Sequence, residues 1–162
     1  ILSVGLIPEN ELSQKAGVQL DSRTKGAFVD ENYQTCVEGI FAAGNVLHVH
    51  DLVDFVSMEA EKLGDSVAEY IKRKSLPKCT IDIETDRMIG YTIPQKISGS
   101  KDVDLSFRVR KNVRNAILEV KQGEETIYKK KLRKAVTSEM EHIHLKKELF
   151  KSNSNIKVVL NA

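Results

Sequence analysis

The stretch TCVEGIFAAGN, from Thr35 to Asn45, carries the most informative pattern in this chain. Its apolar centre, residues 39–44, is short and continuous, which is typical of a strand that is buried on both faces. The stretch then reaches Gly44, and a glycine after a buried strand favours a turn. We therefore predict a buried strand over residues 39–44 that runs into a turn.

The residues before this stretch continue the strand and helix pattern. Residues 1–7 are a nearly continuous apolar run, ILSVGLI, which predicts another strand buried on both faces. Pro8 suits the first turn of a short helix, and Gly17 suits its end. Residues 18–20 and 27–29 flank a turn-rich segment, so these two pieces are expected to pair as a hairpin.

A long helix is expected after the stretch, from Asp54 to Lys74. Its apolar residues recur at helical spacing, and Asp51 or Asp54 could cap its first turn. The positions of the expected apolar face are Val56, Ala60, Leu63, Val67, Tyr70 and Ile71. Pro77 follows the helix and marks a plausible domain boundary.

The second half of the chain loses the helical period and shows short alternating runs. Gln122 to Glu125 form a strong hairpin-turn candidate, and repeated strands of this kind indicate an antiparallel β-sandwich-like domain. The expected strands are residues 80–85, 91–93, 103–110, 116–121, 126–132 and 156–160. The predicted domains are therefore residues 1–75, which are α/β, and residues 78–162.

Charge supports this division. Residues 1–75 hold 7 Lys and Arg against 12 Asp and Glu, whereas residues 76–162 hold 18 against 11. The chain begins inside an apolar run at Ile1, so we interpret it as a piece of a longer protein, although processing would expose the same end. No apolar run approaches the roughly 18 residues of a membrane span and no signal peptide is recognisable, which favours a cytoplasmic location.

The stretch from Thr35 to Asn45 resembles the second FAD-binding motif of the pyridine-nucleotide-disulfide oxidoreductases, a family related to thioredoxin reductase. That motif has a Thr, a short spacer, a Gly-Ile/Val-Phe-Ala-Ala-Gly strand and then an Asp. Residues 4–10 and 26–30 are similar to the segments that precede it in the family. The resemblance covers roughly residues 1–75 and implies the C-terminal part of a Rossmann-like FAD-binding domain.

The resemblance also implies a cofactor site. Gly44 would let the backbone approach the ribityl chain of FAD, and Asn45 stands where the family has an acidic acceptor, so it keeps an oxygen but loses the charge. Val46 follows in the same turn. The start of the long helix, Asp54, Phe55 and Val56, would point backbone N–H groups at the flavin ring.

The phosphate-binding part of such an enzyme is missing from these residues. The chain contains no G-x-G-x-x-G, so the cradles for the FAD pyrophosphate and for NAD(P) are expected upstream. The parent would be an FAD-dependent NAD(P)H oxidoreductase, and this piece alone is expected to be inactive. The alternative is a non-catalytic module in which residues 76–162 mediate contacts with another subunit, a partner or a second copy.

Four further features of the sequence could in principle bind a metal, a nucleic acid or a redox partner. Cys36 and Cys79 lie far apart, which favours two reduced thiols over a disulfide and fits neither a redox nor a zinc pattern. His48 and His50 could form a metal pair, but they have no third ligand in the sequence, so a place near the flavin edge is favoured and no metal is predicted. His142 and His144 repeat the spacing and are interpreted as a solvated strand face. The basic run 129–134 is interpreted as an edge strand rather than a nucleic-acid site.

Overall fold

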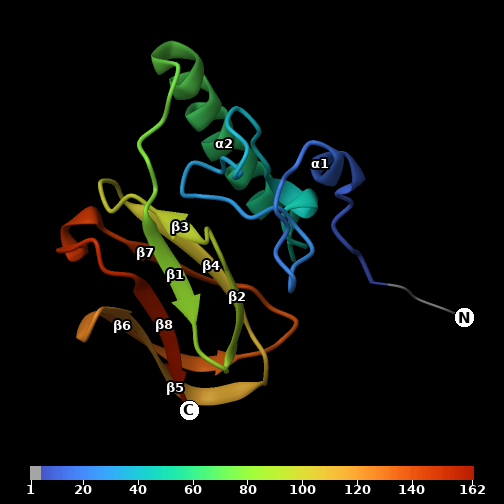
Figure 1. Cartoon of the computed structure of the whole chain (residues 1–162). Helices are drawn as coiled ribbons and strands as arrows, with labels where there is room; N and C mark the ends of the chain where they lie inside the picture. The colour runs from blue at the N-terminus through green and yellow to red at the C-terminus, as the bar shows by residue number, and fades with distance from the viewer. Residues whose placement is uncertain (1–4) are drawn as a thin grey trace, which may run out of the picture. The chain divides into compact units, whose positions relative to one another are not determined.

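The computed structural model describes residues 5–162, which divide into two compact units with the boundary between Leu76 and Pro77 (Figure 1). The first unit contains two α-helices, a single 3-10 turn and long connecting loops. The second unit consists mainly of β-strands. The chain is thus mixed α/β, with few helices. No helix among the described residues is long and apolar enough to cross a membrane.

The first unit begins with a short helix. Helix α1 spans Glu11–Lys15, and Gly17 follows it with a φ of +83°, a left-handed conformation that glycine adopts readily. The expected hairpin is present as a single antiparallel bridge between Leu20 and Ala27, closed by the N–H of Asp21 on the carbonyl of Gly26. Both elements were predicted from their turn residues.

The buried strands predicted for this unit are wrong where they can be judged. Residues 39–44 contain only an isolated bridge between Gln34 and Phe41, because Gly39 (φ +80°) and Gly44 (φ +71°) turn the backbone out of the extended conformation. The strand predicted over residues 1–7 lies partly outside the described residues. Residues 5–7 form no strand, and Leu6 and Ile7 are 70% and 72% exposed.

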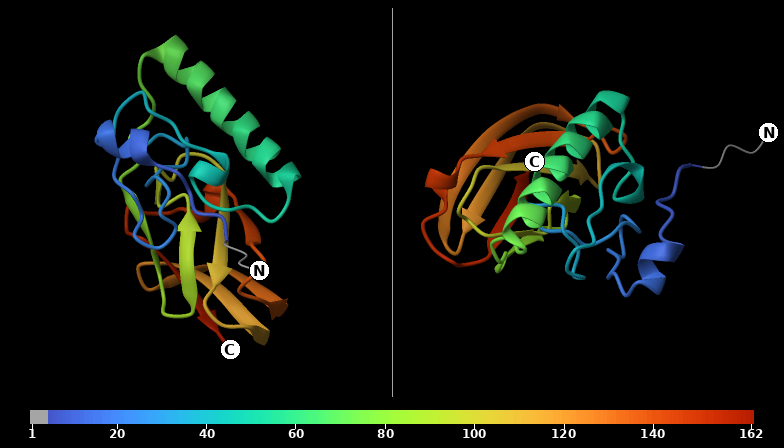
Figure 2. Two further views of the ribbon diagram at one scale, coloured as in Figure 1. Left: turned by 90° about the vertical axis from the view of Figure 1, so that its right-hand side faces the viewer. Right: turned by 90° about the horizontal axis from the view of Figure 1, so that it is seen from above.

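Helix α2 spans Val53–Arg73, within one residue of the prediction at each end (Figure 2). Its N-cap is Leu52, which makes no side-chain cap hydrogen bond, so the predicted caps Asp51 and Asp54 are wrong. The apolar face is only partly covered, since Ile71 is 61% exposed. Glu59 is one of the buried side chains of this helix, although it is charged.

The second unit contains eight strands in two sheets (Figure 1). The five-stranded sheet has the order β3-β1-β8-β5-β6, and the three-stranded sheet has the order β2-β4-β7. The strands are β1 (Ile81–Thr85), β2 (Ile89–Ile93), β3 (Lys96–Ile97), β4 (Val103–Val109), β5 (Val113–Gln122), β6 (Glu125–Ala135), β7 (Glu141–Leu145) and β8 (Ile156–Asn161), with a 3-10 turn, η2 (Lys147–Leu149), before β8.

Both sheets contribute apolar side chains to one hydrophobic core. Phe107 and Leu105 of β4 and Leu118 of β5 are fully buried, and they alternate with more exposed neighbours as the sequence predicted. The pairing is not entirely antiparallel, because β1 runs parallel to β8. A parallel pair forms between strands that are distant in sequence, and alternation within each strand does not reveal this.

The β5–β6 hairpin was predicted correctly. Gln122 pairs with Glu125 across a two-residue loop, in which Gly123 has a φ of +58°. Strand β6 lies at the edge of its sheet and carries the basic run 129–134, in agreement with the edge-strand interpretation. Cys36 and Cys79 form no disulfide with each other; Cys36 is exposed and Cys79 is partly buried.

Candidate functional site

The predicted flavin-binding turn is built around Gly44. This residue begins the 3-10 turn η1 (Gly44–Val46), with a φ of +71°. A Cβ atom at this position would lie 3.3 Å from Cγ1 of Val56 on α2, which is tighter than an ordinary contact. The turn thus needs glycine for two reasons, its left-handed backbone and its close approach to the helix.

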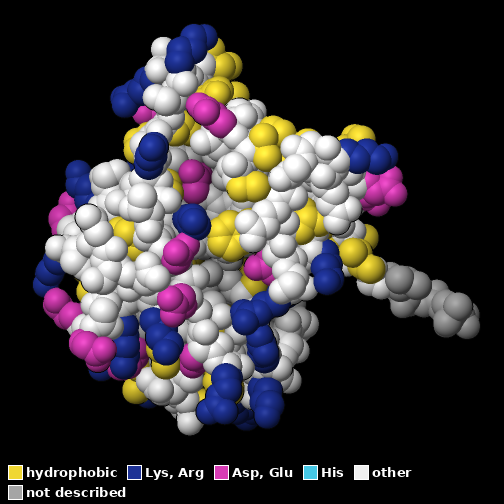
Figure 3. Space-filling view, viewed as in Figure 1, with side chains coloured by type: hydrophobic (Ala, Val, Ile, Leu, Met, Phe, Trp, Pro, Cys, Tyr) yellow, Lys and Arg dark blue, Asp and Glu magenta, His cyan; other side chains and the backbone are white. Residues whose placement is uncertain are grey.

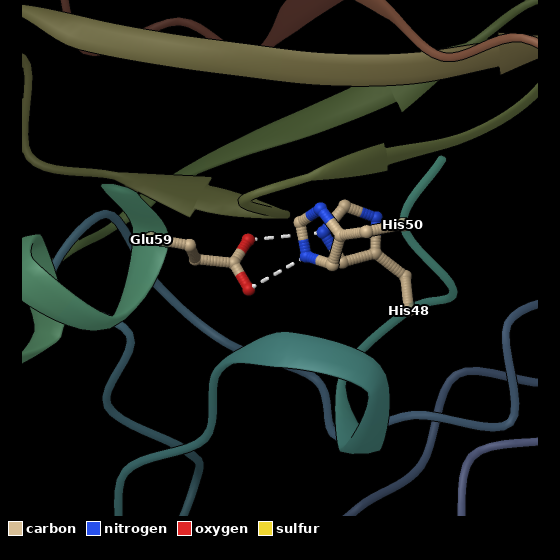
Figure 4. A group of neighbouring side chains, drawn as sticks. All are labelled: His48, His50 and Glu59. Carbon is tan, nitrogen blue, oxygen red and sulfur yellow. Dashed lines mark hydrogen bonds and ion pairs between the residues drawn. The ribbon is translucent and has the colours of Figure 1, made fainter. Parts of the chain in front are cut away.

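Glu59 of α2 connects this turn to the helix. Its carboxylate is buried, with a side-chain exposure of 7%. It accepts a hydrogen bond from the backbone N–H of Gly44 at 2.5 Å. The Nε2 atoms of His48 and His50 lie 2.9 and 3.1 Å from its two oxygens (Figure 4). Three groups from the segment 44–50 therefore converge on one side chain of α2.

The charge of this carboxylate is stabilised locally. Burial alone would raise the pKa of Glu59, because a low-dielectric surrounding disfavours the charged form. Hydrogen bonds with His48 and His50, the charge of His48 and the N–H of Gly44 outweigh burial and lower the pKa to about 2. Glu59 is thus ionised at neutral pH although it is buried.

The two histidines are buried as a pair. Their side chains are 1% and 3% exposed, and their ring centroids lie 4.3 Å apart. The sequence paired His48 with His50 as alternate residues of a strand. The segment is an irregular turn instead, yet both rings still face Glu59.

Glu59 was not among the site residues predicted from the sequence. A signal for it exists, because position 59 lies three residues after Val56 and four before Leu63, within the apolar stripe of the helix. An acid in such a stripe needs a buried partner. The sequence does not show that the partners lie in the loop nine and eleven residues earlier.

Asn45 lies at the surface of the turn. Its side-chain oxygen accepts a hydrogen bond from the backbone N–H of His50 at 3.1 Å. This bond links the two ends of the segment 44–50 on its exposed side. The oxygen has a second lone pair and the amide NH₂ has two donors, so the side chain retains capacity for a ligand.

The other predicted cofactor residues lie beside the turn. Val46 is half-buried in η1. At the start of α2, Asp54 is exposed, whereas Phe55 and Val56 are half-buried. The N-cap residue Leu52 makes no side-chain cap hydrogen bond, and Asp54 places one acidic side chain in the first turn, near the positive end of the helix dipole. The structure therefore brings the start of α2 and the Gly44 turn together, through Val56.

A second histidine cluster lies in the β unit and differs in kind. Nδ1 of His142 bonds Ser106 Oγ at 2.9 Å, and His144 of β7 uses both ring nitrogens, with Asp104 at 2.8 Å and Asp102 at 3.3 Å. The hydrogen bond that His144 donates to Asp104 is the main cause that raises the pKa of His144. Half of the His144 side chain is exposed, which agrees with a solvated strand face.

Residues 1–69 match the family model described as pyridine nucleotide-disulphide oxidoreductase. Most of the N-terminal unit is therefore similar to this oxidoreductase family. The resemblance found in the stretch from Thr35 to Asn45 is thereby confirmed at the level of the family. The match ends inside α2 and does not include the β unit. No curated protein and no solved structure matches the chain.

Proposed function

We propose that the N-terminal unit is the C-terminal part of an FAD-binding domain in an FAD-dependent NAD(P)H oxidoreductase. In this proposal it supplies the ribityl and isoalloxazine side of the flavin site. The observation that carries the proposal is the glycine turn at Gly44, held against α2, within the segment that matches the oxidoreductase family. Members of this family generally use FAD and a nicotinamide nucleotide.

Three features of the unit fit a flavin. The Gly44 turn has a left-handed backbone and lies against the start of α2, so it brings these two parts of the predicted flavin site together. Asn45 beside it is exposed and offers an amide. The start of α2 carries partial positive charge, which suits the negative charge that a flavin gains on reduction. We assign cofactor contacts to Gly44, Asn45 and Val46, and to Asp54, Phe55 and Val56 at the helix start.

The chemistry would divide between the cofactor and the protein. Bound FAD supplies the hydride-accepting group for a nicotinamide substrate. Glu59, anchored by His48 and His50, would hold the Gly44 turn in place, and the helix start would orient the ring. The G-x-G-x-x-G cradles are absent from these 162 residues. We therefore propose that this chain by itself neither retains FAD nor transfers hydride.

Substitution of Asn45 tests the site directly. In the complete protein that contains this chain, Asn45→Ala should weaken FAD binding by about fivefold, because one lost hydrogen bond costs about 1 kcal/mol. Fluorescence titration of FAD into the apoprotein measures this. Asn155→Ala is the matched control, because Asn155 hydrogen-bonds Glu84 and Asp82 within the β unit. Equal FAD affinity in wild type and Asn45→Ala would remove Asn45 from the site.

The role of the β unit stays a prediction. Contact with a subunit or partner is the alternative function for residues 76–162. All of these residues are described, and Ile117, at 45%, is their one exposed large hydrophobic side chain. An apolar docking face is therefore not apparent on this unit. The other exposed large hydrophobic side chains of the described residues lie in the first unit. The face drawn in Figure 3 shows hydrophobic side chains gathered in its upper half.

A further inference from the structure

The group formed by His48, His50 and Glu59 has the donor set of a metal site. Within residues 5–162 it is the one group of three or more His, Cys, Asp or Glu side chains whose ligand atoms all lie within 4.8 Å of one another. Two imidazole nitrogens and one carboxylate oxygen suit Zn²⁺ and other first-row divalent cations.

The distances between donors match a small cation. Zn²⁺ binds nitrogen and carboxylate oxygen at about 2.0–2.2 Å, so neighbouring ligands of a tetrahedral shell lie roughly 3.3–3.5 Å apart. The Nε2 atoms of His48 and His50 lie 2.9 and 3.1 Å from the oxygens of Glu59. The three ligand atoms all lie within 4.8 Å of one another, and rotation of the rings would adjust their positions around one cation.

The surroundings favour this use of the group. All three side chains are at least nine-tenths buried, so a cation would be shielded from competing water. The N–H of Gly44 bonds one oxygen of Glu59, the kind of outer contact that orients a metal-bound carboxylate. The cluster around His144 differs from this group, because the two ring nitrogens of His144 face two different carboxylates and its side chain is half exposed.

We propose that Nε2 of His48, Nε2 of His50 and the carboxylate of Glu59 bind one first-row divalent cation. Three protein ligands leave one position of a tetrahedral shell for water or another small ligand. The cation would join the segment 44–50 to α2 and so fix the Gly44 turn. The site is independent of FAD, and it can exist whether or not the unit binds a flavin.

Zinc binding to the 162-residue chain tests this site. Competition with a chromophoric chelator should show about one tightly bound Zn²⁺ per chain. The variant His48→Ala/His50→Ala should lose at least about a hundredfold in affinity, since even outer-shell changes cost 10–100-fold. The matched control His142→Ala/His144→Ala removes two histidines with the same spacing and should bind Zn²⁺ as wild type does.

Cobalt spectra keep the test valid if the first variant does not fold. In the His142→Ala/His144→Ala background, one equivalent of Co²⁺ should give the intense visible bands of a four- or five-coordinate ion, and adding Glu59→Gln should weaken them. The proposal is overturned by weak bands typical of hydrated Co²⁺, by failure of wild type to bind Zn²⁺, or by Zn²⁺ affinity that survives His48→Ala/His50→Ala.

Discussion

Glu59 is the residue on which the geometry of the first unit depends. It accepts hydrogen bonds from Gly44, His48 and His50, and each of these donors is buried. In Glu59→Ala, with a chelator present, these donors lose their acceptor, and each orphaned buried donor costs about 1–3 kcal/mol. We expect much faster amide exchange at Gly44, measured by hydrogen exchange with mass spectrometry or NMR.

A matched acid on the same helix separates this effect from a general loss of charge. Glu69 forms an exposed ion pair with Arg73 at 3.1 Å. Because exposed pairs contribute about 0–1 kcal/mol, Glu69→Ala should leave exchange at Gly44 unchanged. Equal exchange at Gly44 in wild type and Glu59→Ala would show that the carboxylate does not hold the turn.

His144 provides a test by titration. Asp104 is the main cause that raises its pKa above the ordinary value near 6.5, and Asp102 adds to it. The protonated form is thus favoured by folding, so the stabilisation is complete below pH 6.5 and is lost as the pH rises through the folded pKa. NMR titration should show that Asp104→Asn lowers the pKa of His144. A pKa that does not change would refute the pairing.

The sequence alone predicted part of the site around Gly44, but it did not predict Glu59. The glycine at position 44 and the histidine pair stand out because few residues satisfy a left-handed turn or bind through imidazole. Glu59 does not stand out, because its partners depend on how the loop folds back over the helix. Contacts between separate elements are not encoded in the local pattern.

Helix α2 allows two glycine substitutions with opposite signs. Gly64 is exposed within the helix and a Cβ there would meet nothing within 4 Å, so Gly64→Ala should stabilise the helix by about 0.5–1 kcal/mol. Gly44→Ala should destabilise the unit by more than about 1 kcal/mol, because of its φ of +71° and the contact with Val56. Amide-exchange protection of α2 measures both changes. Effects of the same sign would contradict the description of the turn.

Helices and strands were predicted best where the hydrophobic pattern is long and ends at a proline or glycine. Helix α2 has six turns of periodic sequence before Pro77, and its bounds were predicted within one residue. Residues 39–44 are short, and an apolar run of that length does not distinguish a strand from a bridge between glycine turns. Strand β7 was anticipated only as the strand face of His142 and His144, and the two-residue β3 was missed, since short strands depend on their neighbours for pairing.

At the scale of the whole molecule, the two units differ in how well they bury apolar side chains. The main core cluster lies entirely within residues 81–160, whereas the first unit exposes seven large hydrophobic side chains. We therefore predict that residues 78–162 fold alone and that residues 1–75 do not. Thermal unfolding followed by circular dichroism should be cooperative for residues 78–162, while residues 1–75 should self-associate. A monomeric, cooperatively unfolding 1–75 piece would refute this division.

The central claim is that the Gly44 turn holds one side of a flavin in an oxidoreductase to which this chain contributes. The most direct measurement is the FAD content, by visible absorption, of the purified complete protein as wild type and as Gly44→Val. The account predicts a yellow wild type with about one FAD per chain and a Gly44→Val protein that retains little, while the 162-residue chain alone is colourless. A colourless wild type, or a Gly44→Val protein with full FAD content, would contradict it.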